Sequence, residues 1–176
     1  DSPESIQNSD KLIFPGVGNF GQVMSQLRKL KLVSPIKEFI LSGKPYLGIC
    51  IGLQVLFEGS EESPNEKGLG IFKGKVKKLN TKFKIPQIGW NGVYAKKENS
   101  LENSILGNLP ENFNVYFVHS YILAPDSAEN VLGLTTYGGY EFCSIMKKGN
   151  IYASQFHPEK SGKVGLKIIK NFINSI

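Results

Sequence analysis

A cysteine between two glycines is the first place in this sequence where residue types and spacing could support catalysis. In Gly48-Ile49-Cys50-Ile51-Gly52 an apolar, β-prone run ends and an apolar helical pattern begins. This pattern is typical of a nucleophile elbow, a sharp strand-to-helix turn that raises a nucleophile above a sheet. Flanking glycines let backbones approach closely, and a helix N-terminus favours a thiolate. We expect Cys50 to be a nucleophile; the alternative is a small, buried core cysteine.

A cysteine nucleophile needs a base, and the sequence contains two histidines. His157 ends a strand-like segment and is followed two residues later by Glu159. Alternate side chains of an extended segment share a face, so Glu159 can support the imidazole on the side away from the thiol. His119 has no acidic neighbour and is interpreted as a hydrogen-bonded structural histidine. The sequence therefore predicts Cys50, His157 and Glu159 as nucleophile, base and orienting carboxylate.

Two backbone segments could donate N–H groups to an oxyanion. One is the Ile51 amide, which directly follows the nucleophile. The other is the loop Pro15–Gly18, whose glycines permit a close approach to a ligand. An ordinary tight turn would have the same composition, so both interpretations of the loop stay open. The loop has neither the ending of a P-loop nor the spacing of a dinucleotide-binding fingerprint.

The elements around these residues predict an α/β fold. Apolar runs at Leu12–Phe14 and Pro45–Ile49 alternate with helical patterns at Val23–Leu32 and Ser34–Gly43. Ser34 is placed to cap the second helix, with a proline at its first position. The run Leu12–Phe14 is typical of a strand buried on both faces. This order predicts a mostly parallel central sheet flanked by helices.

Later segments change in character. Gly59–Glu66 is polar and acidic and is interpreted as a loop. From Gly68 to Tyr152, alternating segments separated by turn residues predict an additional region of mixed or antiparallel strands. An amphipathic helix is expected over Lys163–Ile173. We expect residues 1–176 to form a single domain.

Composition limits the classes of partner. Lys and Arg number 21 against 15 Asp and Glu, a net charge of +6, but the lysines are scattered and indicate a solvated face. We therefore expect no nucleic-acid partner. No long apolar segment predicts a membrane span. Cys50 and Cys143 do not suggest a disulfide framework, which fits a cytoplasmic location. No motif predicts a metal or a cofactor.

With these residues in place, the sequence resembles the class I (triad) glutamine amidotransferases, whose sheet is flavodoxin-like. Within that family the likeness is greatest to glutaminase subunits of imidazole glycerol phosphate synthase, an enzyme of histidine biosynthesis. The matching stretches span most of the chain in the family's order. They are Pro15–Gly18, Gly48–Gln54, Ser60–Glu62, Gly89–Asn91, Tyr116–Tyr121 and Phe156–Lys160.

The resemblance implies that glutamine is hydrolysed to glutamate and ammonia through a thioester on Cys50, without a cofactor. It assigns the oxyanion hole to Ile51 and to the Gly16–Val17 peptide. It assigns the glutamine site to Gln54, Glu62 and the backbone of Ser120 and Tyr121. An acidic Glu62 facing an α-ammonium also makes electrostatic sense; the alternative is a solvated loop carboxylate.

The resemblance also implies a heterodimer in which a (β/α)₈-barrel cyclase receives the ammonia and makes imidazole glycerol phosphate and AICAR. Trp90, Asn91, Tyr116 and Lys160 match positions at or near that interface. Trp90 is the single tryptophan of the chain, and tryptophan is enriched at binding hot spots. A core aromatic in a sheet is an equal alternative for Trp90.

Three other functions stay open. Paralogous subunits supply ammonia for amidino-sugar (surface glycan) biosynthesis and need the same three catalytic residues. A stand-alone cysteine hydrolase would need no partner, and a non-catalytic interaction subunit could keep the fold. Family members also begin with a strand, a helix and a strand before the Pro15–Gly18 loop. Most of these elements are absent here, and we expect the missing ones to precede residue 1 of the present sequence.

Overall fold

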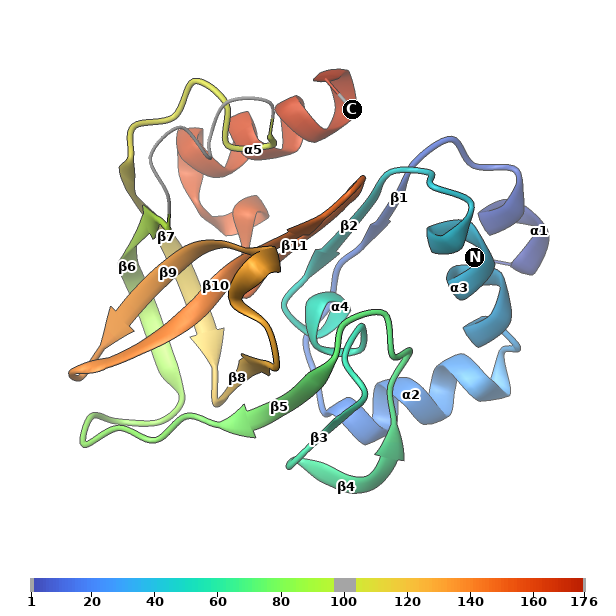
Figure 1. Cartoon of the computed structure of the whole chain (residues 1–176), viewed down its shortest axis with the longest axis horizontal. Coiled ribbons are helices and arrows are strands. Elements are labelled where there is room, and N and C mark those ends of the chain that lie inside the picture. The colour runs from blue at the N-terminus through green and yellow to red at the C-terminus, as the bar shows by residue number, and fades with distance from the viewer. Residues whose placement is uncertain (1, 97–103, 176) are drawn as a thin grey trace.

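The computed structural model describes residues 2–96 and 104–175 (Figure 1). Its helices are α1 (Pro3–Gln7), α2 (Phe20–Lys29), α3 (Val33–Leu41), α4 (Ile51–Gln54) and α5 (Gly162–Ser175), with 3₁₀ turns η1 (Ala128–Asn130) and η2 (Pro158–Lys160). Its strands are β1 (Leu12–Phe14), β2 (Tyr46–Ile49), β3 (Gly59–Ser60), β4 (Ser63–Lys67), β5 (Gly74–Lys78), β6 (Gln87–Ala95), β7 (Asn112–His119), β8 (Tyr121–Pro125), β9 (Val131–Tyr137), β10 (Tyr140–Lys148) and β11 (Ile151–Ser154).

The central strands form a parallel set that branches at β10. Strands β1, β2 and β11 are parallel neighbours, and β10 runs antiparallel to β11. From β10 one branch continues through β8, β5, β3 and β4, and the other through β9, β6 and β7. Figure 1 shows these two branches diverging from β10. The predicted α/β class, with a parallel centre and a mixed-strand region, is therefore confirmed.

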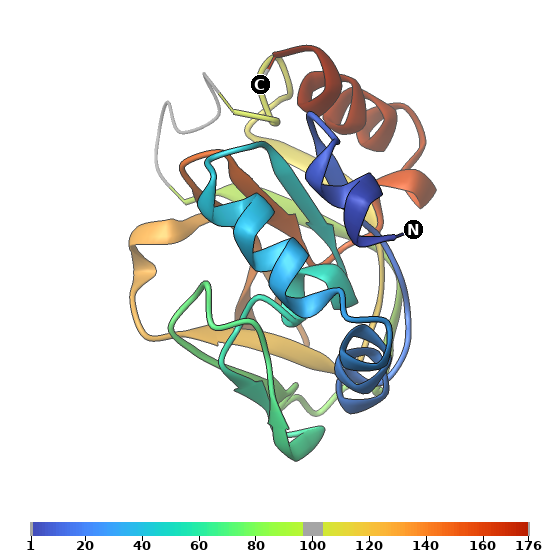
Figure 2. The same cartoon turned by 90° about the vertical axis from the view of Figure 1, so that its right-hand side faces the viewer.

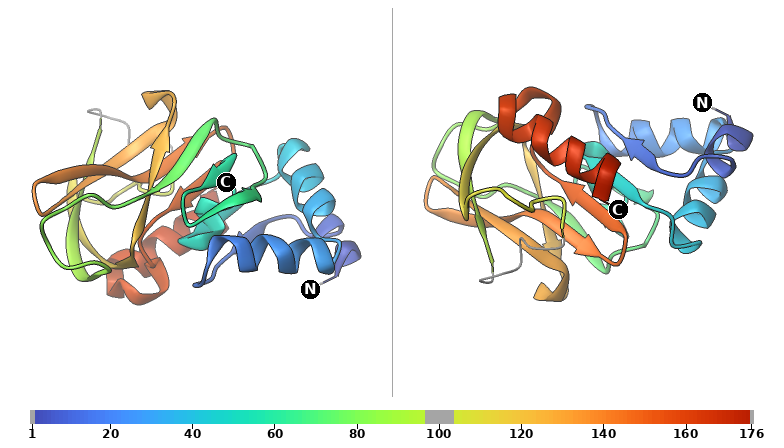
Figure 3. Two further views of the ribbon diagram at one scale, coloured as in Figure 1. Left: turned by 90° about the horizontal axis from the view of Figure 1, so that it is seen from below. Right: turned by 90° about the horizontal axis from the view of Figure 1, so that it is seen from above.

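Helices cover both faces of the parallel strands. Tyr46 and Ala153 pack into a cluster with residues of α2 and α3. Leu47 and Tyr152, which point the other way, pack into a second cluster with residues of α5 and of β7. Figure 2 shows α1, α2 and α3 toward the viewer, and Figure 3 shows α3 and α5 on opposite sides of the central strands. This two-sided cover explains the continuous apolar sequence of β2.

Three local predictions were wrong. Leu12–Phe14 is only partly buried, with Ile13 37% exposed, because in the described chain β1 pairs with β2 alone and lies at the sheet edge. Helix α3 begins at Val33 with Leu32 as its N-cap, so Ser34 is not the cap. The proline after Ser34 is still tolerated, because the first-turn amides lack helical partners. Gly59–Glu66 is not a loop, since it contributes β3 and most of β4.

No helix in residues 2–96 or 104–175 is both long enough and apolar enough to cross a membrane.

The turn between β2 and α4 depends on its two glycines. A Cβ atom built on Gly48 would lie 2.4 Å from the carbonyl oxygen of Gly52, and one built on Gly52 would lie 1.9 Å from that of Phe14. Each obstacle is backbone, which cannot rotate aside as a side chain can. The turn is therefore packed directly against β1, the strand that leads into the Pro15–Gly18 loop.

We predict that Gly52→Ala lowers the free energy of unfolding by at least about 3 kcal/mol, because the methyl group would overlap the Phe14 carbonyl. Urea denaturation of the purified chain measures this. Gly92→Ala is the matched control, since a Cβ there would lie 3.6 Å from Asn114 Oδ1, an ordinary contact. Equal stabilities of the two variants would contradict the prediction.

Candidate active site

Cys50 occupies a strained backbone position at the tip of the turn. Its φ is 54° and its ψ is −105°, a region that residues with a Cβ rarely adopt. The Cys50 amide donates to Ser154 O at 2.8 Å, and the Cys50 carbonyl accepts from the amides of Leu53 and Gln54. These hydrogen bonds fix the strained backbone of Cys50 to the end of β11 on one side and to the first turn of α4 on the other. The geometry is that of the predicted elbow.

His157 leaves the carboxyl end of the adjacent parallel strand. Because Ile49 pairs with Ser154, Cys50 and His157 follow neighbouring strands β2 and β11 at the same edge of the sheet. The His157 amide donates to Tyr116 O at 2.9 Å. Its Nδ1 lies 2.7 Å from Glu159 Oε1, and the ring is 1% exposed. Nε2 is buried and has no hydrogen-bond partner among the described residues, so it makes no hydrogen bond to Cys50 Sγ in this structure.

The thiol of Cys50 is protonated in this state. Burial raises the pKa of Cys50 to about 11, and the nearby Ile51 amide opposes that shift only in part. The carboxylates of Glu159 and Glu62 raise the pKa of Cys50 further. The amide at the start of α4 lowers the pKa of Cys50, as expected for a helix N-terminus, but burial outweighs this effect. Helix α4 has only four residues, too few to offset the burial of a charge.

The loop Pro15–Gly18 lies against the elbow. A Cβ on Gly16 would be 3.1 Å from Ile51 Cγ2, and Val17 is 65% exposed. Gly16 has φ of 152° and Gly18 has φ of 135°, values that suit glycine. The two predicted sources of oxyanion donors are thus neighbours in space.

Two of the predicted glutamine-binding residues, Gln54 and Tyr121, are hydrogen-bonded to each other, whereas Ser120 and Glu62 bond to other residues. Gln54 Nε2 donates to Tyr121 O at 3.3 Å, and the Ser120 carbonyl accepts from the Leu79 amide at 2.9 Å. Glu62 Oε2 accepts from the Phe20 amide at 2.7 Å. Glu62 is therefore not the solvated loop carboxylate of the alternative interpretation.

Gln155, which is hydrogen-bonded to Gln54, was missed by sequence reasoning. Its side chain is fully buried; Nε2 lies 3.8 Å from Cys50 Sγ, and Oε1 accepts from Gln54 Nε2 at 3.2 Å. A signal was present, because Gln155 precedes His157 by two positions in an extended segment.

His119 is a buried neutral histidine whose Nδ1 donates to Tyr121 O at 2.9 Å. Its ring centroid lies 5.5 Å from that of Phe117 and 5.2 Å from that of Phe142. Burial lowers the pKa of His119 to about 4. The predicted structural histidine is hydrogen-bonded at one nitrogen, while Nε2 has no partner in the described part of the chain.

Apolar side chains gather on the outer face of the β6–β7 hairpin. Trp90 and Ile88 are each 60% exposed, so Trp90 is not a core aromatic. Trp90 makes an edge-on contact with Tyr116, with ring centroids 6.4 Å apart, and lies near Gly162. Lys160 is exposed on η2, which follows His157.

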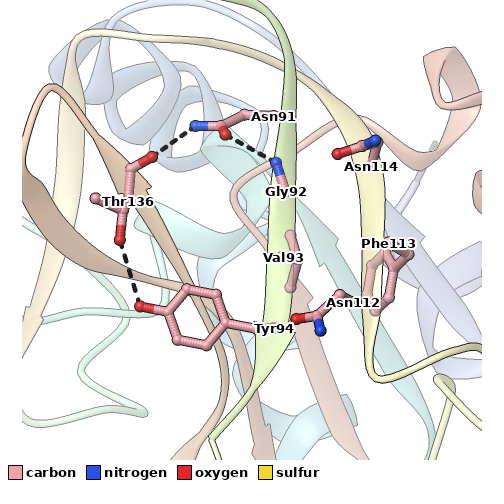
Figure 4. A pocket seen from close by; sticks show the side chains of 8 residues that line it. All are labelled: Asn91, Gly92, Val93, Tyr94, Asn112, Phe113, Asn114 and Thr136. Carbon is pink, nitrogen blue, oxygen red and sulfur yellow. Dashed lines mark hydrogen bonds between the residues drawn. The ribbon is translucent and has the colours of Figure 1, made fainter.

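Asn91 turns away from this apolar face toward strand β9. Its amide donates to Thr136 O at 2.9 Å and accepts from the Gly92 amide at 2.8 Å. Figure 4 shows Asn91 and Tyr94 both directed toward Thr136, beside a pocket of about 310 Å³. Asn91 therefore braces β6 against β9, whereas Trp90 is open to solvent.

Among residues 2–96 and 104–175, no group of three or more His, Cys, Asp or Glu side chains is placed to hold a metal ion.

The comparisons define the class of protein. The model of the family "Glutamine amidotransferase class-I" matches residues 1–176, so the chain belongs to the class-I glutamine amidotransferases. Two solved structures support the fold. "Crystal structure of glutamine amidotransferase" has a TM-score of 0.71 at 18% identity and covers 98% of this chain and 82% of that one. "Structure of PurLQS from Thermotoga maritima" has a TM-score of 0.71 at 20% identity and covers 95% and 80%.

Several individual relatives within this family carry the name of one enzyme, imidazole glycerol phosphate synthase. A protein of Aquifex aeolicus, "Imidazole glycerol phosphate synthase subunit HisH", is 51% identical over 164 residues, 93% of this chain and 77% of that protein. A Pyrococcus furiosus protein of the same name is 48% identical over 97% of this chain and 84% of its own length. "Imidazole glycerol phosphate synthase hisHF" of Schizosaccharomyces pombe is 42% identical over 98% of this chain and 32% of its own length.

We predict that alkylation of Cys50 by iodoacetamide accelerates about tenfold per pH unit from pH 7 to 10 without levelling off, because the thiol pKa is about 11. Peptide mass spectrometry after quenching measures the rate at Cys50. An exposed model thiol in the same samples is the control and levels off near pH 9. A plateau for Cys50 at that pH would contradict the raised pKa.

We predict that His119 makes stability fall as pH drops from about 6.5 to about 4. In that window the unfolded histidine binds a proton that the folded one excludes, so acid favours unfolding by up to about 3 kcal/mol. Urea denaturation at pH 7 and pH 4.5 measures the difference. His119→Gln, which cannot titrate, is expected to reduce the pH dependence; an unchanged pH dependence would exclude His119 as its source.

Proposed function

We propose that the chain is the glutaminase subunit of imidazole glycerol phosphate synthase. It hydrolyses glutamine and passes ammonia to a (β/α)₈-barrel cyclase in histidine biosynthesis. The observation that carries the proposal is the position of Cys50 and His157 directly after neighbouring parallel strands at one sheet edge, with Glu159 hydrogen-bonded to the imidazole. Relatives with 42–51% identity over nearly the whole chain bear the name of that synthase. The proposed location is the cytoplasm.

The proposed mechanism begins at the Cys50 sulfur. His157 Nε2 takes the thiol proton, and the sulfur attacks the side-chain amide carbon of glutamine. His157 then protonates the departing ammonia, leaving a γ-glutamyl thioester. Water, deprotonated by the same nitrogen, attacks the thioester, and the thiol regains its proton as glutamate leaves. Glu159 holds Nδ1–H and stabilises the imidazolium formed in each half.

The oxyanion of each tetrahedral intermediate would bind to two backbone donors. The Ile51 amide already interacts with the Cys50 sulfur and lowers its pKa. The Gly16–Val17 peptide lies on the neighbouring loop and would supply the second donor. Turning this peptide changes ψ of Gly16 and φ of Val17, and Gly16, which has no Cβ and a φ of 152°, tolerates a wide range of ψ.

Glutamine would lie between α4 and the start of β8. Gln54 and the backbone of Ser120 and Tyr121 would hold its polar groups. Glu62 would attract the α-ammonium of glutamine. The negative charge of Glu62 already raises the pKa of both Cys50 and Tyr121, so its field extends over this region. The same carboxylate accepts from the Phe20 amide, so the N-terminus of α2 holds it in place.

The cyclase would dock on the apolar face of β6 and β7. Trp90, Ile88 and Tyr116 offer an exposed aromatic and aliphatic surface, and Lys160 adds a positive charge at its edge. Asn91 lies near the interface and would act by bracing β6. Support comes from the fission yeast relative, in which the matching region is 32% of one longer chain named hisHF.

The test is glutamate release from glutamine by the purified chain, alone and with the barrel cyclase and its ligand. We predict a low rate alone, because the Cys50 thiol is protonated, and at least about a hundredfold stimulation by the loaded cyclase. Cys50→Ala is expected to abolish the activity by about a thousandfold or more.

Cys143→Ala is the matched control, because this second buried cysteine is expected to leave glutamate release unchanged. Release that persists in Cys50→Ala would overturn the mechanism. Full activity without the cyclase would favour a stand-alone hydrolase. Normal growth of a deletion strain without histidine would favour the sugar-pathway paralogue.

A further inference from the structure

A continuous line of hydrogen bonds runs from the wall of the proposed glutamine site to the sulfur of Cys50. His119 Nδ1 donates to Tyr121 O, which also accepts from Gln54 Nε2. Gln54 Nε2 donates its other hydrogen to Gln155 Oε1. Gln155 Nε2 then lies 3.8 Å from Cys50 Sγ, within the longer range of hydrogen bonds to sulfur. The line joins four elements: β7, β8, α4 and the end of β11.

The orientation of the Gln155 amide is fixed by its neighbour. Gln54 Nε2 is a donor, so the end of the Gln155 amide that it meets must be the oxygen. The other end, which faces Cys50, is therefore the NH₂ group. Both glutamines are buried, at 0% exposure for Gln155 and 5% for Gln54, so water does not compete for these groups. A reversed amide would place two NH₂ groups together and leave the sulfur facing an oxygen.

A donor at this place matters because the sulfur is itself buried and lies near two carboxylates. Burial and the charges of Glu159 and Glu62 disfavour a negative sulfur. A neutral N–H donor stabilises the thiolate more than the thiol, because a hydrogen bond to a charged acceptor is the stronger one. The Gln155 side chain provides such a donor from the segment after β11 that also carries His157.

We propose that Gln155 is the side-chain donor that stabilises and orients the Cys50 thiolate, with Gln54 fixing the direction of its amide. The proposal deepens the glutaminase function proposed above and rests on it for its catalytic meaning. Its core claim concerns the thiolate and can be tested without turnover.

The test uses Cys143→Ala as the parent, so that Cys50 is the only thiol in the chain. Gln155→Glu keeps an acceptor for Gln54 but removes the N–H donor, and Gln155→Met keeps the length without polar atoms. The rate of Cys50 alkylation by iodoacetamide is measured from pH 7 to 10. We expect both variants to react about tenfold more slowly than the parent at each pH, which corresponds to a thiolate harder to form by about one pH unit.

The direction of the change in alkylation rate distinguishes a thiolate donor from a residue that only maintains the structure. A variant that merely loosens the site would expose Cys50 and speed its alkylation, whereas loss of the donor slows it. Gln87→Met is the matched control, since Gln87 is another buried glutamine, on β6, and makes no hydrogen bond to Cys50 within the described chain. We expect Gln87→Met to leave the rate unchanged. Circular dichroism confirms that each variant is folded.

Rates equal to or faster than the parent in folded Gln155→Met would overturn the proposal. If Gln155→Glu does not fold because it buries a charge, Gln155→Met alone decides. Glutamate release by the parent with the loaded cyclase is recorded in parallel. No release from the parent, with slowed alkylation in the Gln155 variants, would refute the glutaminase proposal but support the thiolate donor. Glutamate release from the parent, with unchanged alkylation in the Gln155 variants, would support the glutaminase proposal but refute the thiolate donor.

Discussion

The parallel pairing of β2 with β11 is the constraint on which the site depends. The register that sets Ile49 opposite Ser154 lets the Cys50 amide donate to the Ser154 carbonyl, immediately after the strand ends. One hydrogen bond thus ties the strained elbow to the segment that carries Gln155 and His157. A shift of one residue would turn alternate side chains to the other face and separate nucleophile from base.

Burial disfavours the ionised form of Cys50. Cys50 and His157 are both almost fully enclosed, so bulk water has only limited access to the thioester proposed at Cys50. The same enclosure raises the thiol pKa to about 11. A change that strengthens donors to the sulfur, or brings an oxyanion donor into place, therefore has a large effect on reactivity. Such a site suits an enzyme whose ammonia is useful only when an acceptor is present.

The branch point at β10 connects the site to the surface proposed for the cyclase. Through β11, this strand supports the elbow; through β9, it supports β6 and its exposed Trp90. Tyr116 joins the two regions directly, since its carbonyl accepts from the His157 amide while its ring contacts Trp90. Docking on the hairpin would thus act on a residue bonded to His157, the proposed catalytic base.

The sequence by itself determined the α/β order, the elbow at Cys50 and the pairing of His157 with Glu159, because these depend on residues close together in the chain. For Trp90 the sequence left an exposed interface residue and a buried core aromatic equally possible, since exposure depends on tertiary packing. It mistook Leu12–Phe14 for a doubly buried strand, because edge position depends on strand order. Tertiary structure alone decided the contact between Gln155 and the sulfur and the protonation of Cys50. Both arise where segments about a hundred residues apart enclose one another, and no local pattern encodes that enclosure.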